Sequence, residues 1–225
     1  TTVARCLTGL ERPEEGIIEV CGRIRDEKRV SAAERRLRAH EMQMIFQNPY
    51  GSLNPRHKIG EAVRSTALLH KSTSRADAEA YVAALLDRVG LPEAVNSAYP
   101  RQLSGGQRQR AAIACALAVE PDALVLDEAV AALDLSIQAQ ILNLLAALRA
   151  EGDISFVFIS HDLSVVRQVS ETIAVMRRGE VVESGRTRDV LSAPQHPYTQ
   201  RLVASIPHPG WDPHALLDRK LTPAV

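Results

Sequence analysis

The sequence predicts an α/β fold in which a parallel sheet is covered by helices on both faces. Two apolar stretches, "ALVLDE" and "SFVFISHD", have the length and composition of buried strands, and they alternate with helical stretches. From about Ile59 to Val89 the sequence is Ala-rich with a helical pattern, which predicts a helical subdomain inserted into this core. The 225 residues, 45% of them hydrophobic, suffice for one sizeable core with a smaller subdomain.

The first 55 residues predict a helix followed by two strands. Val3, Leu7 and Leu10 recur at helical spacing, and glycine and proline residues between positions 9 and 16 mark the end of that helix. The short β-branched stretch "IIEVCGRI" predicts a strand, and the Arg-rich segment 23–40 predicts a loop with a helical turn. "MQMIFQ" predicts the next strand, and "NPYGSLNPR" after it predicts an extended loop.

The rest of the chain predicts further helices and strands, and then a tail. "STSRADAEA" offers an N-cap for the second helix of the inserted segment, and a turn at Ser104 follows that segment. Strands are predicted in "ALVLDE", "SFVFISHD" and "TIAVMRRGEVVESG". From Ala193 the sequence is rich in proline and histidine, and we interpret His196, His208 and His214 as surface residues of a docking tail rather than as metal ligands.

The composition argues against several classes of protein. Lys and Arg together number 27, as do Asp and Glu, whereas a protein that coats nucleic acid usually has a clear basic excess. Cys6, Cys21 and Cys115 are scattered, which fits a reducing cytosol better than a disulfide framework or a zinc site. No apolar run approaches the roughly 18 residues of a membrane span, so we expect any membrane association to be peripheral.

The octapeptide "LSGGQRQR" predicts an anion-binding helix start. Ser104 stands where a helix N-cap would, and Gly105 and Gly106 leave the first amides of the helix uncovered. Those amides and the positive end of the helix dipole attract phosphate. An ordinary Ser-capped helix after a glycine turn is the alternative, but a strand ending in Asp-Glu comes after the octapeptide and favours the functional interpretation.

Polar residues suited to phosphate chemistry end three predicted strands. "ALVLDE" delivers Asp127 and Glu128 to the carboxyl end of its strand, where open α/β sheets bind ligands. Asp127 can hold Mg²⁺ through water molecules, and Glu128 can act as a general base. His161 can hydrogen-bond a γ-phosphate, and Gln47 can reach a metal or a water molecule. Taken one at a time, each is more simply a solvated residue at a strand end.

Taken in order, these stretches resemble the nucleotide-binding subunit of an ATP-binding cassette (ABC) transporter. The order is Gln after a strand, LSGGQ, a strand ending in Asp-Glu, "AALD", and a strand ending in Ser-His, and the match covers nearly the whole chain. "FQNPYGSLNPR" and "HPYTQRLVASIP" further resemble the ATPases of bacterial oligopeptide, dipeptide and nickel importers. The resemblance implies a P-loop NTPase (ABC ATPase) core, here lacking its first strands, with ATP and Mg²⁺ as cofactors.

The resemblance also implies a role for each matching residue. Gln47 would be the Q-loop residue that links the nucleotide to the transmembrane partner, Glu128 the catalytic base, and His161 the switch histidine. Asp134 of "AALD" would lie in the D-loop at a dimer interface. The signature that contacts ATP bound to the opposite subunit would be Ser104, Gly105, Gly106 and Gln107, so two subunits would share each site.

The opening residues resemble the segment directly after the phosphate-binding loop GxxGxGK[ST] of this family. On that basis Thr1 would bind magnesium together with Gln47 and Asp127, and Thr2 would contact a phosphate; the alternative is that both threonines merely begin a helix. The Lys and glycines of the loop, the preceding strands and an adenine-stacking aromatic are absent from these 225 residues. We therefore interpret the chain as truncated after the Walker A lysine, and expect it on its own neither to bind ATP usefully nor to hydrolyse it.

The parent protein is interpreted as the ATP-hydrolysing subunit of an ABC importer for peptides, nickel or similar small solutes, peripheral at the cytoplasmic face of the inner membrane. Expected partners are a second ABC ATPase subunit, identical or paralogous, transmembrane permeases and, indirectly, an extracytoplasmic solute-binding protein, with no nucleic acid. The expected domains are an ATPase core at 1–55 and 104–192, a helical subdomain at 56–103 and a C-terminal extension at 193–225. The alternatives are a non-transport ABC ATPase acting on DNA or ribosomes, and an inactive truncated remnant.

Overall fold

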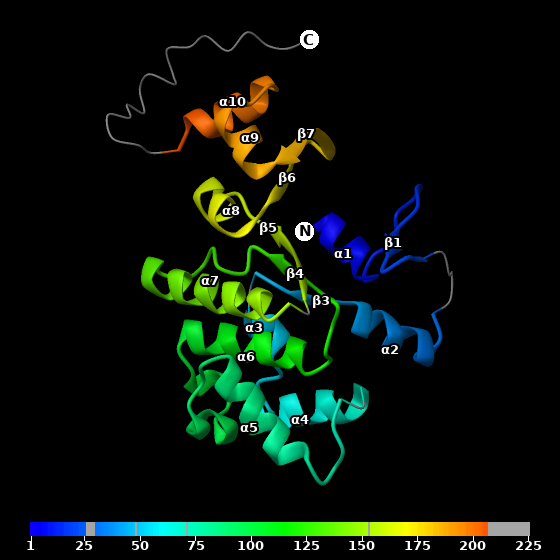
Figure 1. Ribbon diagram of the computed structural model, residues 1–225. Helices are drawn as coiled ribbons and strands as arrows, with labels where there is room; N and C mark the ends of the chain where they lie inside the picture. The colour runs from blue at the N-terminus through cyan, green and yellow to red at the C-terminus, as the bar shows by residue number, and fades with distance from the viewer. Residues whose placement is uncertain (26–29, 48, 71, 153, 207–225) are drawn as a thin grey trace. The chain divides into compact units, whose positions relative to one another are not determined.

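The computed structural model describes residues 1–25, 30–47, 49–70, 72–152 and 154–206, which fall into two compact units divided between Ile159 and Ser160 (Figure 1). The first unit holds a three-stranded parallel sheet in the order β3–β4–β5, and the second holds an antiparallel pair of strands. The predicted α/β class with a parallel sheet is therefore confirmed.

The central strand β4 (Ala123–Asp127) pairs on one side with β3 (Met42–Ile45) and on the other with β5 (Ser155–Ile159). All five residues of β4 are buried, as expected for an apolar strand with a neighbour on each side. In this register Ile45 lies opposite Leu126. The chain segments after β3 and β4 therefore leave the sheet at the same edge.

The N-terminal segment differs from the sequence prediction in two ways. The helix α1 (Thr2–Leu7) is shorter than the predicted helix, because the chain turns at Gly9, whose φ is +76°. The stretch 17–24 is a hairpin rather than one strand, with β1 (Glu19–Val20) antiparallel to β2 (Arg23–Ile24). Cys21 and Gly22 both have positive φ, 50° and 74°, as a two-residue hairpin turn requires.

The Arg-rich segment was predicted to be a loop with a helical turn, and this was wrong. It forms the ten-residue helix α2 (Ala32–Glu41), which Ser31 caps by accepting a hydrogen bond of 3.1 Å from the backbone N–H of Glu34. The helix has little apolar periodicity, since Leu37 is its one large aliphatic side chain and is 44% exposed. Its stability rests on ion pairs instead.

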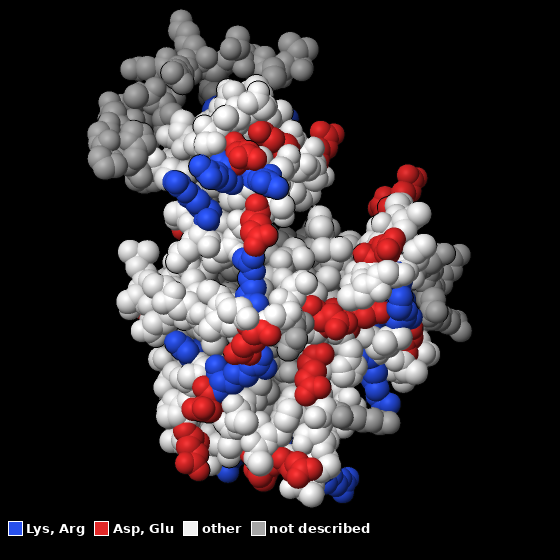
Figure 2. All heavy atoms as spheres, in the orientation of Figure 1, with Lys and Arg blue, Asp and Glu red and all other residues white. Residues whose placement is uncertain are grey.

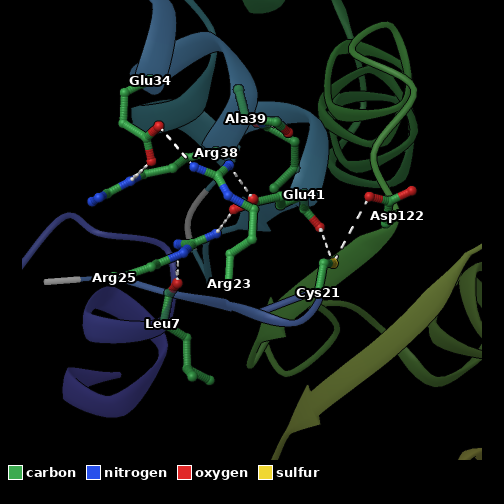
Figure 3. Close-up of polar contacts among 10 residues, drawn as sticks. Leu7, Cys21, Arg23, Arg25, Glu34, Arg38, Ala39, Glu41 and Asp122 are labelled. Atoms are coloured by element: carbon green, nitrogen blue, oxygen red, sulfur yellow. Dashed lines mark hydrogen bonds and ion pairs between the residues drawn. The ribbon is translucent and has the colours of Figure 1, made fainter. Parts of the chain in front are cut away.

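These ion pairs join α2 to the hairpin (Figure 3). Glu34 accepts from Arg38, one turn further along the helix, at 2.8 Å, and from Arg23 of β2 at 2.9 Å. Glu41 is 4% exposed and accepts from Arg23 at 2.7 Å and from Arg25 at 2.9 Å. The carboxylate of Glu41 is thus desolvated but paired with two guanidinium groups, the arrangement that a buried charge requires.

In the first unit, most of the chain that connects the strands is helical. Figure 1 shows α6 lying between α7 and the pair α4–α5, and α6 contacts all three helices. Asp77 takes the N-cap position of α5 but its side chain makes no capping hydrogen bond. The elements are α3 (Pro49–Ser52), α4 (Ile59–His70), α5 (Ala78–Arg88), the 3-10 turns η1 (Glu93–Ser97) and η2 (Pro100–Gln102), α6 (Gly105–Leu117) and α7 (Leu135–Ala150).

In the second unit the stretch "TIAVMRRGEVVESG" forms a hairpin of two strands, β6 (Thr172–Arg177) and β7 (Glu180–Arg186). The other elements of this unit are α8 (Leu163–Val169), α9 (Thr187–Ser192) and α10 (Pro197–Ala204). The half-buried His196 caps α10, because its Nδ1 accepts from the backbone N–H of Tyr198 at 3.1 Å. His208 and His214 lie outside the described residues.

In the portion of the chain described, no helix is both long enough and apolar enough to cross a bilayer.

Candidate functional site

Asp127 is the last residue of β4 and lies next to the first residue of the chain. Its side chain is almost fully buried, and Oδ1 is 3.5 Å from the amino nitrogen of Thr1. This Oδ1 has no hydrogen-bond partner among the described residues. Thr1 and Thr2 are exposed at the start of α1, and the hydroxyl of Thr1 makes no capping hydrogen bond. The structure thus brings Thr1 beside the carboxylate with which it was predicted to share a metal.

Glu128 and Gln47 meet at the same edge of the sheet. Gln47 follows β3 and donates a hydrogen bond of 2.7 Å from Nε2 to Oε2 of Glu128. The backbone N–H of Glu128 donates to the carbonyl of Ile159 at 2.9 Å, and its own carbonyl accepts from Ala131 at 3.1 Å. These bonds hold the turn after β4 against the end of β5.

The backbone of Glu128 is strained. Its φ is +50°, a left-handed conformation that a residue with a Cβ rarely adopts and that costs on the order of 1–3 kcal/mol. Asp127 is buried, whereas Glu128 is half-buried. Two adjacent acids with different surroundings can serve different chemical roles.

Ser104 is the exposed N-cap of α6 and forms a reciprocal capping box with Gln107. Its Oγ accepts from the backbone N–H of Gln107 at 3.2 Å, and Oε1 of Gln107 accepts from the backbone N–H of Ser104 at 3.0 Å. The Ser104 hydroxyl keeps its own proton for donation, because it acts only as an acceptor in this box.

The two glycines of the signature are in different surroundings. A Cβ on Gly106 would lie 2.5 Å from Cγ2 of Ile137 in α7, which is closer than real side chains approach. A Cβ on the exposed Gly105 would lie 3.6 Å from Cδ2 of Leu133, an ordinary contact. Helix packing therefore requires glycine at 106, a reason absent from the sequence interpretation. Sequence reasoning missed Ile137, which lies in a different helix and belongs to none of the motifs.

Asp134 is the N-cap of α7. Its Oδ1 accepts hydrogen bonds of 2.9 Å from the backbone N–H of Ile137 and from the hydroxyl of Ser136. These bonds, the one from Ile137 foremost, hold the pKa of the Asp134 carboxyl below its usual range. Because Ile137 also packs on Gly106, the structure brings the Asp134 turn next to the Ser104 turn.

His161 belongs to the second unit and is exposed. The next residue, Asp162, caps α8 by accepting from the backbone N–H of Ser164 at 2.9 Å. The hydroxyl of Ser164 is the main reason that the pKa of Asp162 is lowered. A common action of His161 with Glu128 stays a prediction.

Two protein-family models match the chain. Residues 1–131 match the family described as "ABC transporter", and residues 182–222 match the one described as "Oligopeptide/dipeptide transporter, C-terminal region". Together the two matches include all the candidate site residues except Asp134 and His161.

Curated relatives carry related names. The chain is 46% identical over 207 residues to "Glutathione import ATP-binding protein GsiA" of Pectobacterium atrosepticum, covering 92% of this chain and 33% of that protein. It is 41% identical over 207 residues to "Dipeptide transport ATP-binding protein DppF" of Escherichia coli, covering 92% of this chain and 61% of that protein. The chain thus spans a third to three fifths of the length of these relatives.

Solved structures share the fold. The cbiO1 protein of Clostridium perfringens, described as part of the ABC transporter complex cbiONQ, matches with a TM-score of 0.74 at 26% identity, over 85% of this chain and 74% of that one. The ATP-binding cassette MJ0796, a dimer in a post-hydrolysis state bound to ADP and Pi, matches with a TM-score of 0.69 at 27% identity, over 83% and 80% of the two chains. These matches confirm the P-loop NTPase fold.

Proposed function

Because the chain belongs to the ABC transporter family of ATPases, we propose that its protein is the ATP-hydrolysing subunit of an importer of peptides or similar small solutes. The observation that carries the proposal is the hydrogen bond of 2.7 Å between Gln47 and Glu128, with the buried Asp127 adjacent to Glu128 in the chain. The match of residues 182–222 to a peptide-transporter region favours transport over work on DNA or ribosomes.

The residues present fit a hydrated magnesium ion. Oδ1 of Asp127 is a buried oxygen that accepts no hydrogen bond within the described residues, and its ion pair with the amino group of Thr1 at 3.5 Å places Thr1 beside it. Gln47 gives its amide N–H to Glu128 and keeps its carbonyl oxygen for another contact. Carboxylate, hydroxyl and amide oxygens are the ligands that Mg²⁺ prefers. When bound with ATP, the ion supplies positive charge to the β- and γ-phosphates.

Glu128 is proposed to be the general base. The hydrogen bond from Gln47 holds Oε2 in place and so orients the carboxylate that would accept a proton from the attacking water. His161 is proposed to orient the γ-phosphate as a hydrogen-bond donor. We assign Thr2 a phosphate contact, because it begins α1 beside the same strand end.

The site is proposed to be completed by a second ATPase subunit. Ser104 is exposed at the start of a 13-residue helix, where the first backbone N–H groups have no partner within the helix. With Gly105, Gly106 and Gln107 it would bind ATP held by the other copy, and Asp134 would lie at the same interface. Such a pair would act on transmembrane permeases from the cytoplasmic face of the membrane. An extracytoplasmic solute-binding protein would deliver the solute to those permeases.

Replacing Glu128 tests the proposed base. In the protein assembled with its permeases, Glu128→Gln should slow ATP hydrolysis by about 10²–10⁴-fold, or about 2.7–5.5 kcal/mol in activation free energy, and leave ATP binding intact. The matched control is Glu14→Gln, which removes the same charge from an exposed residue. Hydrolysis within twofold of the unaltered protein in the Glu128 variant would contradict the assignment.

Mixing two inactive variants tests the shared site. A homodimer of Ser104→Arg should not hydrolyse ATP, because both of its signatures are altered. A homodimer of Glu128→Gln should not hydrolyse ATP either, because both of its proposed bases are missing. A mixed dimer would contain one composite site with both groups intact, so we expect ATP hydrolysis to return when the variants are co-assembled. Mixed dimers that form but stay inactive would show that each copy works alone.

A further inference from the structure

The second unit contains a hollow of about 850 Å³ between the α8–β6 turn and α9. Three arginines from different elements line it: Arg167 in α8, Arg186 at the end of β7 and Arg188 in α9. Hydroxyl groups of Ser170, Thr172 and Ser192 complete much of the wall. Its size is that of a site for a small molecule.

The frame of the hollow is tied together by hydrogen bonds. Thr187 is 3% exposed, and its backbone N–H donates to the carbonyl of Glu171 at 2.8 Å. The hydroxyl of Ser170 donates to the carbonyl of Val166 at 2.7 Å and lies 3.4 Å from that of Thr187. Arg186 and Arg188 therefore flank a residue that is fixed to the turn on the other side of the hollow.

The charge in the hollow is positive. Glu171 is the one acidic residue among the described residues that line it, against three arginines. Within the described residues, the guanidinium groups of Arg167, Arg186 and Arg188 form no ion pair. Figure 2 shows Lys and Arg side chains gathered over the α8 and α9 region of this unit, with acidic ones beside them. Like charges repel, and an anion bound in the hollow would relieve the repulsion among the arginines that line it.

We propose that this hollow binds a phosphate ester. Guanidinium groups present two N–H donors in a plane that matches two phosphate oxygens, and the hydroxyl of Thr172 adds a single donor. Leu191 is the one aliphatic side chain in the described lining, so the ligand is polar rather than a nucleobase or an acyl chain. A soluble phosphate ester and the headgroup of an anionic lipid share this chemistry. The hollow lies wholly within residues 167–192 and is independent of the proposed ATP site.

Binding of two probes tests the proposal. The soluble probe is sn-glycerol 3-phosphate, followed by calorimetry, and the lipid probe is phosphatidylcholine vesicles with and without phosphatidylglycerol, followed by co-sedimentation. We expect the unaltered protein to bind one probe or both, more weakly as salt rises. Arg186→Gln and Arg188→Gln should each raise the dissociation constant about tenfold, or about 1.4 kcal/mol.

Arg178→Gln is the matched control, because Arg178 is an exposed arginine of the same unit outside the lining. Its affinity should stay within twofold of the unaltered protein. Arg167→Gln, on a different element, gives a second test if a variant of β7 or α9 fails to fold. Loss of glycerol 3-phosphate binding in the lining variants identifies a soluble ligand. Loss of phosphatidylglycerol-dependent sedimentation in the same variants identifies a lipid headgroup. Equal affinity in the lining variants and the control, or no binding of either probe, would overturn the proposal.

Discussion

Replacing Gly106 by alanine separates a packing role of this glycine from a role in nucleotide binding. The added Cβ would lie 2.5 Å from Cγ2 of Ile137, about 1 Å inside an ordinary contact. Either α6 and α7 separate or Ile137 changes rotamer, and such overpacking costs about 1–3 kcal/mol. Alanine is intrinsically better than glycine in a helix by up to about 1 kcal/mol. We therefore expect the free energy of unfolding to fall by about 1–2 kcal/mol.

Urea denaturation in two backgrounds measures this effect. In Ile137→Ala the clashing methyl is gone, so Gly106→Ala should there be neutral or stabilising by up to about 1 kcal/mol. Gly105→Ala is the control, because its Cβ would meet only Cδ2 of Leu133 at 3.6 Å, and it should be neutral or slightly stabilising. A loss of stability on Gly106→Ala that is the same in both backgrounds would refute the packing argument.

Three further perturbations have expected outcomes. Glu41→Ala should lower the free energy of unfolding in urea by about 3–5 kcal/mol, because it leaves Arg25, whose side chain is 4% exposed, without its carboxylate; a loss below about 1 kcal/mol would contradict this. Burial first, and the charge of His40 second, lower the pKa of His70, so the unfolded chain binds a proton more readily than the folded one. Stability should therefore fall as the pH drops below the ordinary value of 6.5, and His70→Asn should flatten that fall in a pH series of thermal melts. Burial raises the pKa of Cys115 to about 12, so iodoacetamide should label it at about pH 8 only after unfolding. Peptide mapping separates its label from those on Cys6 and the exposed Cys21, and rapid labelling of Cys115 itself in the folded protein would contradict this.

The ends of the parallel strands were predictable from sequence because their signal is local. An apolar run followed by acids places Asp127 and Glu128 at the carboxyl end of β4, and the structure has them there. The helix α2 was not predictable in the same way, since charged residues give it no apolar stripe. Its ion pairs join residues as far apart in sequence as Arg23 and Glu41, and nothing local states which arginine a buried carboxylate will meet.

The same limit explains the two signature glycines. Local sequence shows that both could expose helix amides, but only the fold shows that Gly106 touches Ile137, thirty-one residues further along the chain. Gly105 is exposed, so it is the glycine whose uncovered backbone can contact a ligand. The assignment of these residues to nucleotide binding stays a prediction, and the packing contact adds a second constraint to one of them.

The packing contact also bears on how a shared site would work. Ser104 fixes the start of α6, Asp134 fixes the start of α7, and the Gly106–Ile137 contact joins the two starts. The capping hydrogen bonds mean that neither turn has to be ordered when a ligand arrives, which removes part of the entropic cost of binding. In the proposed pair of subunits, the signature and the D-loop of one copy would therefore approach the other copy's ATP as one body. A shift of one turn would displace the other, so loss of either cap should weaken both contacts together.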